Sequence, residues 1–277
     1  MALAVFNARA DLISDRITVT VQGQGPDVVL IPGLTCPGAV WDATVAHLAG
    51  RYRVHVVQIN GFGGVPARAN AQGPVVQPSL DALDAYIKSN HLVAPKIIGH
   101  SLGGTMGMML ALQHPEDVGN LMIVDSLPFS GMIFGATDLE SAKTVAAKMR
   151  DNTLNESQDD YAKGEARFIR ILVKSPDGRK LATAWAVASD KSVVARASYD
   201  DLTTDLRPKL REIKTPVTVL YPWDESSGYT QPETDAFYAQ NYATLPNKKM
   251  VRVDGAYHFM MLDQPEKFLE QVDAFLK

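Results

Sequence analysis

The stretch "KIIGHSLGGTMGMMLALQHPE", residues 96–116, joins two kinds of secondary structure with almost no linker. Near its start the stretch has the β-branched residues Ile97 and Ile98, shortly after Pro95. A short β-branched run after a proline favours a buried strand over a helix. From Leu102 to Gln113 the apolar residues recur at helical spacing, and His114-Pro115 ends the pattern. The stretch therefore predicts a strand, a tight turn and a helix in immediate succession.

Ser101 lies on the turn between this strand and this helix. The pattern Gly99-His100-Ser101-Leu102-Gly103 fits a nucleophile elbow, in which flanking glycines clear space so that a strained serine stands exposed at the top of a sheet. The N–H groups at the start of the helix would face any negative charge that develops there. Because Gly and Ser are common residues, the pattern alone is weak, and the strand and helix around it carry the prediction. The alternative is a glycine-rich turn whose serine only caps the helix.

Short apolar strands alternate with helices along most of the chain. We expect strands at 17–21, 28–31, 52–59, 96–98, 121–125, 216–221 and 249–253, and helices at 42–50, 79–90, 102–113, 232–242 and 265–276. Asp263 at or beside the cap and Pro265 in the first turn are expected to begin the last of these helices. The alternation predicts right-handed βαβ units and a parallel sheet covered on both faces.

Residues 127–208 interrupt this alternation. The segment is rich in Ala, Lys, Glu and Asp, has helical patches at 138–152 and 160–174, and contains no convincing strand. We therefore expect a core formed by 1–126 and 209–277, with 127–208 inserted as a helical cap or lid.

The composition narrows the range of partners. The chain has 27 basic and 31 acidic residues and no run of like charges, so the charges suggest neither nucleic acid nor an anionic membrane surface as a binding partner. No stretch approaches the roughly 18 apolar residues of a membrane span. The start "MALAVFNARA" lacks the features of a signal peptide, so a cytoplasmic location is the default expectation, with export after removal of a leader left open. We expect a small-molecule substrate and a monomer or homodimer.

Four motifs spread over nearly the whole chain resemble those of the α/β-hydrolase family. They are "PGLT" at 32–35, "NGFGG" at 60–64, "GHSLGG" at 99–104 and "AYHFMMLDQPEKF" at 256–268, with an acidic residue after "PVTVLYPW" as a fifth feature. The sequence departs from the family at Asn60, where an aspartate is usual, and at Pro32, where many members have histidine. The resemblance implies a serine esterase-like α/β-hydrolase fold, with a mostly parallel central sheet, helices on both faces and an inserted helical cap. It implies no metal and no organic cofactor.

A serine hydroxyl needs a base that takes its proton and a third group that orients the base. Among the six histidines, only His258 lies in a loop between a late strand and the last helix, at the sheet edge that also carries Ser101. His55 is assigned to a strand, His47 and His114 to helices, and His91 to another loop. His100 adjoins the serine and is expected to be structural. In the family, the transition-state oxyanion is bound by two backbone N–H groups, which correspond here to Leu34 and Leu102. Cys36 is near this loop but is expected to be a small packing residue.

The third group, an acidic residue that orients the histidine, is the one for which the sequence leaves several candidates. Asp224 follows the strand at 216–221 and occupies the family's usual site, so it is the first choice. Glu225 could serve after a shift of one residue. Asp125, at the end of the strand before the insertion, is the third candidate, with a turn residue bonded to nearby amides as its alternative role.

The residues expected to face the site are apolar, which favours an uncharged acyl or aryl group. They are Phe129, Met132, Ile133, Phe134, Phe259 and Met260, and packing between cap and core is their alternative role. The prediction is a carboxylic ester hydrolase that works through an acyl-serine intermediate. A lactonase, a thioesterase or a hydrolase of carbon–carbon bonds would use the same residues. A ligand-binding receptor with little turnover is the alternative from another class.

Overall fold

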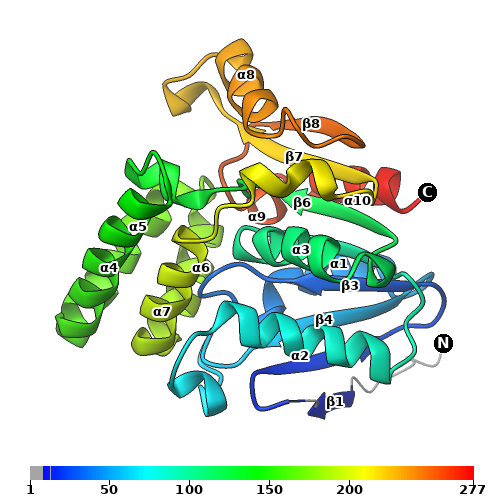
Figure 1. Cartoon of the computed structure of the whole chain (residues 1–277), viewed down its shortest axis with the longest axis horizontal. Coiled ribbons are helices and arrows are strands. Elements are labelled where there is room, and N and C mark those ends of the chain that lie inside the picture. The colour runs from blue at the N-terminus through cyan, green and yellow to red at the C-terminus, as the bar shows by residue number, and fades with distance from the viewer. Residues whose placement is uncertain (1–8, 13) are drawn as a thin grey trace.

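A computed structural model describes residues 9–12 and 14–277 of the chain. Most of the N-terminal stretch considered for a leader, and the first part of the expected core, lie outside these residues. The described residues form one sheet of eight strands in the order β1-β2-β4-β3-β5-β6-β7-β8 (Figure 1). The strands are β1 (Arg9–Leu12), β2 (Ile17–Gln22), β3 (Asp27–Ile31), β4 (Arg53–Ile59), β5 (Lys96–His100), β6 (Asn120–Val124), β7 (Val217–Trp223) and β8 (Lys248–Asp254).

The sheet is parallel from β4 to β8, and only β1 and β2 run antiparallel to their neighbours. The α-helices are α1 (Asp42–Leu48), α2 (Val76–Ser89), α3 (Leu102–Gln113), α4 (Leu139–Asn155), α5 (Gln158–Leu172), α6 (Pro176–Ala188), α7 (Lys191–Leu202), α8 (Gln231–Asn241), α9 (Met260–Asp263) and α10 (Pro265–Leu276). Short 3-10 helices lie at Gly38–Trp41, Arg68–Ala71, Pro115–Asp117, Ser130–Phe134, Arg207–Glu212 and Glu225–Ser227. No helix of the described residues is both long and apolar enough to span a membrane.

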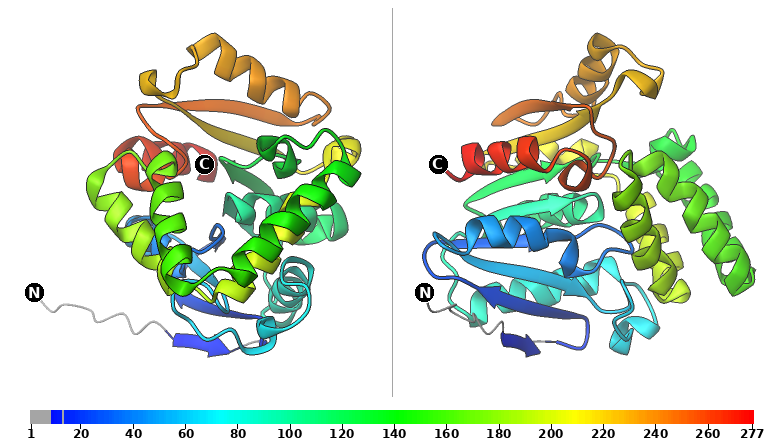
Figure 2. Two further views of the ribbon diagram at one scale, coloured as in Figure 1. Left: turned by 90° about the vertical axis from the view of Figure 1, so that its left-hand side faces the viewer. Right: turned by 180° about the vertical axis from the view of Figure 1, so that it is seen from behind.

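Both faces of the sheet are covered, which explains why its strands read as continuous apolar runs. In β3, Val29 and Ile31 join a hydrophobic cluster with α2, α3 and α8, whereas Val28 and Leu30 join a second cluster with α1 and α10. The alternation follows from the two-residue repeat of a strand. Figure 2 shows α10 and α1 on the face opposite to that seen in Figure 1. The fold class expected from the sequence is confirmed.

Between β6 and β7 the chain is helical. Helices α4 to α7 lie together beyond one end of the strands, where α4 packs on α7 and α5 packs on α6 (green to yellow in Figures 1 and 2). Residues of α7 join the first hydrophobic cluster, and residues of α5 and α6 join the second. The two helix pairs are therefore anchored to opposite faces of the core.

Polar contacts fix this helical segment at its turns. Asp263 accepts hydrogen bonds from the backbone N–H groups of Lys174 and Ser175, between α5 and α6, and also from that of Tyr257. Asp263 lies beside the N-cap residue of α10, Gln264, and Pro265 is in the first turn, as expected, but the helix has no side-chain cap bond. The carboxylate of Asp263 binds the turn between α5 and α6 instead. A long-range acceptor of this kind leaves no local sequence pattern.

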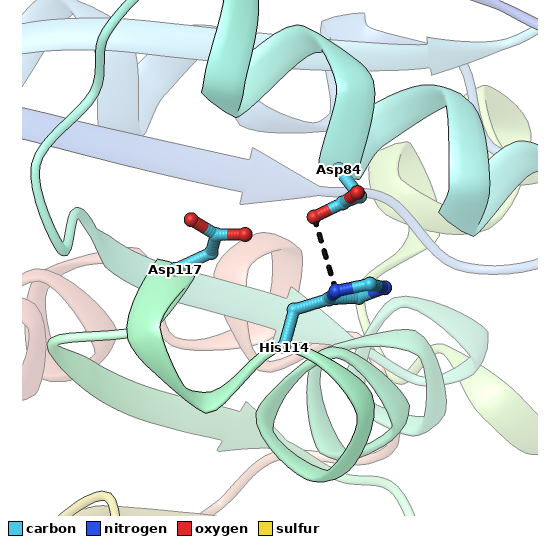
Figure 3. A group of neighbouring side chains, drawn as sticks. All are labelled: Asp84, His114 and Asp117. Atoms are coloured by element: carbon cyan, nitrogen blue, oxygen red, sulfur yellow. Dashed lines mark ion pairs between the residues drawn. The ribbon is translucent and has the colours of Figure 1, made fainter.

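A charged cluster joins the far end of α3 to α2. The carboxylates of Asp84 and Asp117 and the ring of His114 lie close together, with ligand-type atoms within 4.8 Å of one another (Figure 3). Their types and spacing suit a metal ion. Lys88 already supplies a cation, because its Nζ lies 2.8 Å from Asp84, 3.5 Å from Asp117 and 3.4 Å from His114. The cluster thus acts as an ion-pair contact between α2 and the residues after α3.

Helix α2 receives its N-terminal cap from the helical segment. Its own N-cap residue, Val75, provides no side-chain acceptor. The carboxylate of Asp200, in α7, accepts hydrogen bonds from the N–H groups of Val75 at 2.7 Å and Val76 at 3.0 Å. These N–H groups have no partner within the helix, so the distant aspartate satisfies them.

We expect Asp200→Ala to lower the free energy of unfolding by about 0.5–2 kcal/mol, the usual effect of losing an N-cap. Urea unfolding followed by circular dichroism measures the change. Asp159→Ala is the control, because Asp159 is exposed at the start of α5 and its side chain makes no hydrogen bond in the described structure. Its effect should stay within about 0.5 kcal/mol. Equal stability of the two variants would contradict the capping role.

Candidate active site

Ser101 stands on a strained turn between β5 and α3. Its backbone has φ 54° and ψ −122°, a conformation that non-glycine residues rarely adopt. The turn is held by hydrogen bonds from the N–H of Ser101 to the carbonyl of Val124 and from the N–H of Gly104 to the carbonyl of Ser101. The side chain is partly exposed, and its Oγ makes no hydrogen bond within the described residues. This is the geometry expected of a nucleophile elbow.

The glycines around Ser101 are required by close backbone contacts. A Cβ on Gly99 would lie 2.1 Å from the carbonyl oxygen of Gly103. A Cβ on Gly103 would lie 2.2 Å from the carbonyl oxygen of Ile31, at the end of β3. Because backbone atoms cannot move aside as a flexible side chain can, neither position accepts a larger residue. The motif therefore reflects packing of β3, β5 and α3.

Two backbone N–H groups near Ser101 have no acceptor. Leu102 is the first residue of α3, so its N–H has no partner within the helix. Leu34 lies in the loop after β3, beside Thr35, which has a positive φ of 63°. Neither N–H donates a hydrogen bond in the described part of the chain. Both are available to an oxygen atom held next to Ser101.

His258 is hydrogen-bonded to Asp125. Its Nδ1 lies 2.6 Å from Asp125 Oδ2, and both side chains are largely buried, with 18% and 13% exposed. Since a carboxylate only accepts, Nδ1 carries the hydrogen and Nε2 remains free to accept a proton. Nε2 has no partner among the described residues. This is the arrangement that a general base and a supporting carboxylate would need.

Strand order explains why Asp125 lies near the serine. Strands β5 and β6 are parallel neighbours, with His100 paired with Val124, so Ser101 and Asp125 each follow the end of adjacent strands. The loop after β8 carries His258 across to them. Asp125 has a positive φ of 44°, which turns the chain sharply at the end of β6.

Asp224, the first choice from the sequence, does not contact His258. Its buried carboxylate forms an ion pair with Lys174, from the turn between α5 and α6, and accepts hydrogen bonds from Ser226. Burial opposes ionisation of Asp224, but Lys174 and Ser226 outweigh it and hold its pKa below the ordinary value. Glu225 is exposed, and no hydrogen bond or ion pair joins its side chain to His258 in the described structure. In the described structure the carboxylate that bonds to His258 is that of the third candidate, Asp125, whereas the carboxylate of Asp224 is held by Lys174.

The apolar residues expected to line the site are spread over different environments. Phe129, Phe259 and Met260 are 0%, 3% and 0% exposed and belong to hydrophobic clusters, which matches the packing alternative. Ile133 and Phe134 are 65% and 36% exposed. Met132 borders a surface pocket that is also lined by Arg207 and Phe237. The described structure does not bring these six side chains together.

Two residues near the site were not found from the sequence. Tyr238, in α8, donates a hydrogen bond to the second oxygen of Asp125, and burial together with the charge of Asp125 raises its pKa well above the ordinary value. Tyr238 therefore stays protonated and holds Asp125. Asp201, in α7, lies near Thr105, and burial raises its pKa. Neither residue belongs to a sequence motif, because both lie on helices that are distant in sequence from Ser101 and Asp125.

Cys36 is buried, as expected for a packing residue, and burial raises the pKa of its thiol to about 12. A thiol with such a pKa is a poor nucleophile at neutral pH.

The model of the family described as "Alpha/beta hydrolase family" matches residues 28–271. The chain belongs to the alpha/beta hydrolase family. It is 38% identical over 270 residues to the pimeloyl-[acyl-carrier protein] methyl ester esterase of Aeromonas salmonicida, covering 94% of this chain and 99% of the relative. It is 28% identical over 269 residues to the esterase of the same name from Nitrosomonas europaea, covering 93% and 98%. The family expected from the motifs is confirmed, and the esterase relatives support the expectation of a carboxylic ester hydrolase.

Solved structures share the fold. The enol-lactonase of Burkholderia xenovorans superposes with a TM-score of 0.77 at 19% identity, covering 97% of this chain and 99% of that one. A hydrolase from Pseudomonas aeruginosa gives 0.76 at 20% identity, covering 98% of both chains. At these identities the likeness establishes the fold alone.

We expect Gly33→Ala to reduce ester hydrolysis by about 10²–10³-fold, the range for loss of an oxyanion donor. A Cβ on Gly33 would lie 2.9 Å from His100 Nδ1 and 3.0 Å from Ser101 Cβ, so the Leu34 N–H would be displaced. The measurement is kcat/KM with p-nitrophenyl acetate. Gly164→Ala is the control, since a Cβ there meets nothing within 4 Å. A folded Gly33→Ala enzyme that keeps more than a tenth of the activity would contradict the expectation.

Proposed function

We propose that this alpha/beta hydrolase is a serine hydrolase of carboxylic esters, with Ser101 as nucleophile, His258 as base and Asp125 as orienting acid. The hydrogen bond of 2.6 Å between His258 and Asp125, beside the strained turn of Ser101, carries the proposal. The esterase relatives support the class of reaction.

Acylation begins when Ser101 Oγ attacks the ester carbonyl and His258 Nε2 takes its proton. Asp125 accepts the Nδ1–H of the ring, keeps the correct tautomer and stabilises the imidazolium that forms. The developing oxyanion receives hydrogen bonds from the N–H groups of Leu34 and Leu102. His258 then gives its proton to the leaving alkoxide, which departs as an alcohol and leaves an acyl-serine.

Deacylation repeats these steps with water. His258 Nε2 takes a proton from water, which attacks the acyl carbonyl, and the oxyanion again faces the two N–H groups. Return of the proton to Ser101 Oγ releases the carboxylic acid. In the resting structure Ser101 Oγ and His258 Nε2 share no hydrogen bond, and such bonds often tighten only in the substrate complex.

The segment 127–208 serves in this proposal as a cap over the site, with 1–126 and 209–277 as the core. Its two helix pairs are anchored to opposite faces of the core, and Asp224 and Asp263 fix the turn between α5 and α6 next to the His258 loop. In this proposal the substrate is a carboxylic ester. The methyl ester of a pimeloyl group on an acyl-carrier protein, which the relatives' name states, is one candidate.

We expect Ser101→Ala to lower kcat for p-nitrophenyl esters by several orders of magnitude, because only binding and the oxyanion donors remain. A serine-directed phosphonate should add one covalent group to the parent enzyme and none to the variant, as read by intact-protein mass spectrometry. Ser89→Ala, at the exposed end of α2, is the control outside the elbow and should keep turnover and labelling. If Ser101→Ala keeps a tenth or more of the activity while folded, the nucleophile is another residue. A parent protein that binds esters without multiple turnover would favour the receptor alternative.

We expect Asp125→Asn to lower kcat by about 10⁴-fold, because an amide in that place favours the wrong histidine tautomer. Asp224→Asn and Glu225→Gln should change kcat by less than about tenfold, since Asp224 pairs with Lys174 and Glu225 is exposed. The three variants are compared by steady-state kinetics after circular dichroism confirms the fold. A collapse of activity in Asp224→Asn, with Asp125→Asn active, would return the acid to the residue favoured by the sequence.

A further inference from the structure

His100 is buried between the loops that carry the other groups of the site. The residue is 0% exposed and directly precedes Ser101. Its ring centroid lies 4.5 Å from that of His258 and 4.8 Å from that of Phe259, and its edge meets the ring of Trp41 at 90°. Its Nδ1 faces Gly33, where a Cβ would lie only 2.9 Å away. The side chain of His100 therefore contacts both the loop that carries His258 and the loop after β3 that carries Leu34.

The hydrogen bond of His100 defines its tautomer. Its Nε2 lies 3.1 Å from the backbone carbonyl oxygen of His258, which can only accept, so Nε2 carries the hydrogen. Its Nδ1 is buried without a hydrogen-bond partner in the described structure. Burial, followed by the charge of His258, lowers the pKa of His100 well below the ordinary value, so the ring stays neutral. A neutral ring with hydrogen on Nε2 is a fixed donor to the His258 main chain.

We propose that His100 is a positioning residue, which holds the backbone of His258 in place through its Nε2–H and so keeps the base between Asp125 and Ser101. The inference rests on the proposed function of the triad. The backbone on either side of His258 is also held by the bonds from Phe259 N–H to the carbonyl of Leu172 and from Tyr257 N–H to the carboxylate of Asp263. Leu172 belongs to α5, and Asp263 also binds the turn between α5 and α6, so both bonds connect the loop with the helical segment. The bond from His100 instead connects the loop directly with β5, the strand that ends at Ser101.

The contact has a kinetic consequence that packing alone does not have. A base displaced by about 1 Å can cost about 10²-fold in rate. Loss of the Nε2–H donor should therefore lower kcat and leave substrate binding nearly unchanged, because His100 is too buried to touch substrate.

His100→Gln, His100→Asn and His100→Leu separate donation from packing. A Gln amide nitrogen can reach the position of Nε2, an Asn amide stops near the position of Nδ1, and Leu fills space without a donor. We expect Gln to keep kcat within about fivefold of the parent, and Asn and Leu to lose about 10–100-fold, with KM within about twofold in all three. If Leu prevents folding, the comparison of Gln with Asn decides the question.

Hydrogen exchange read by mass spectrometry on residues 255–260 tests the same contact without relying on activity. Exchange should be faster in Asn and Leu than in the parent, and near the parent rate in Gln. Equal kcat and equal exchange in Gln and Asn would overturn the positioning role. If the parent turns over no ester, the proposed function fails, while the exchange pattern still reports whether His100 holds the loop.

Discussion

The parallel pairing of β5 with β6 is the constraint on which the site depends. It sets His100 opposite Val124, so the residues that follow, Ser101 and Asp125, leave the sheet side by side. Both have positive φ angles, which turn the chain sharply at the same edge. The glycines beside Ser101 then allow β3, β5 and α3 to approach within backbone contact. A histidine that reaches the same edge of the sheet can then approach both residues, and the loop after β8 places His258 there.

Because His258 bonds to Asp125, the acid after β7, Asp224, is not engaged by the histidine. Asp224 instead pairs with Lys174, and Asp263 binds the N–H groups of Lys174 and Ser175. The two carboxylates thus fasten the turn between α5 and α6 to the core next to the base. Burial would make an unpaired Asp224 costly, so its ion pair with Lys174 also explains how the carboxylate can remain inside.

Local patterns in the sequence predicted most of the fold. The helix at 102–113 and the last helix at 265–276 were predicted with their observed bounds, since the apolar spacing and nearby prolines define them. Helices α6 and α7 were expected only as part of the helical insertion and not located individually, because their buried faces consist largely of alanines and a few valines, which give a weak periodic signal. The serine and histidine could be proposed from motifs and chain order. The partner of His258 could not, because Asp125 and Asp224 end neighbouring strands and only the position of Lys174 distinguishes them.

The proton between His258 and Asp125 offers the most direct measurement of this account. In protein labelled with nitrogen-15 in histidine, the hydrogen on His258 Nδ1 should give a proton resonance far downfield, identified by its loss in His258→Gln. The account predicts that this resonance persists in Asp224→Asn and disappears or moves strongly upfield in Asp125→Asn. A resonance that survives Asp125→Asn and is lost in Asp224→Asn would contradict it.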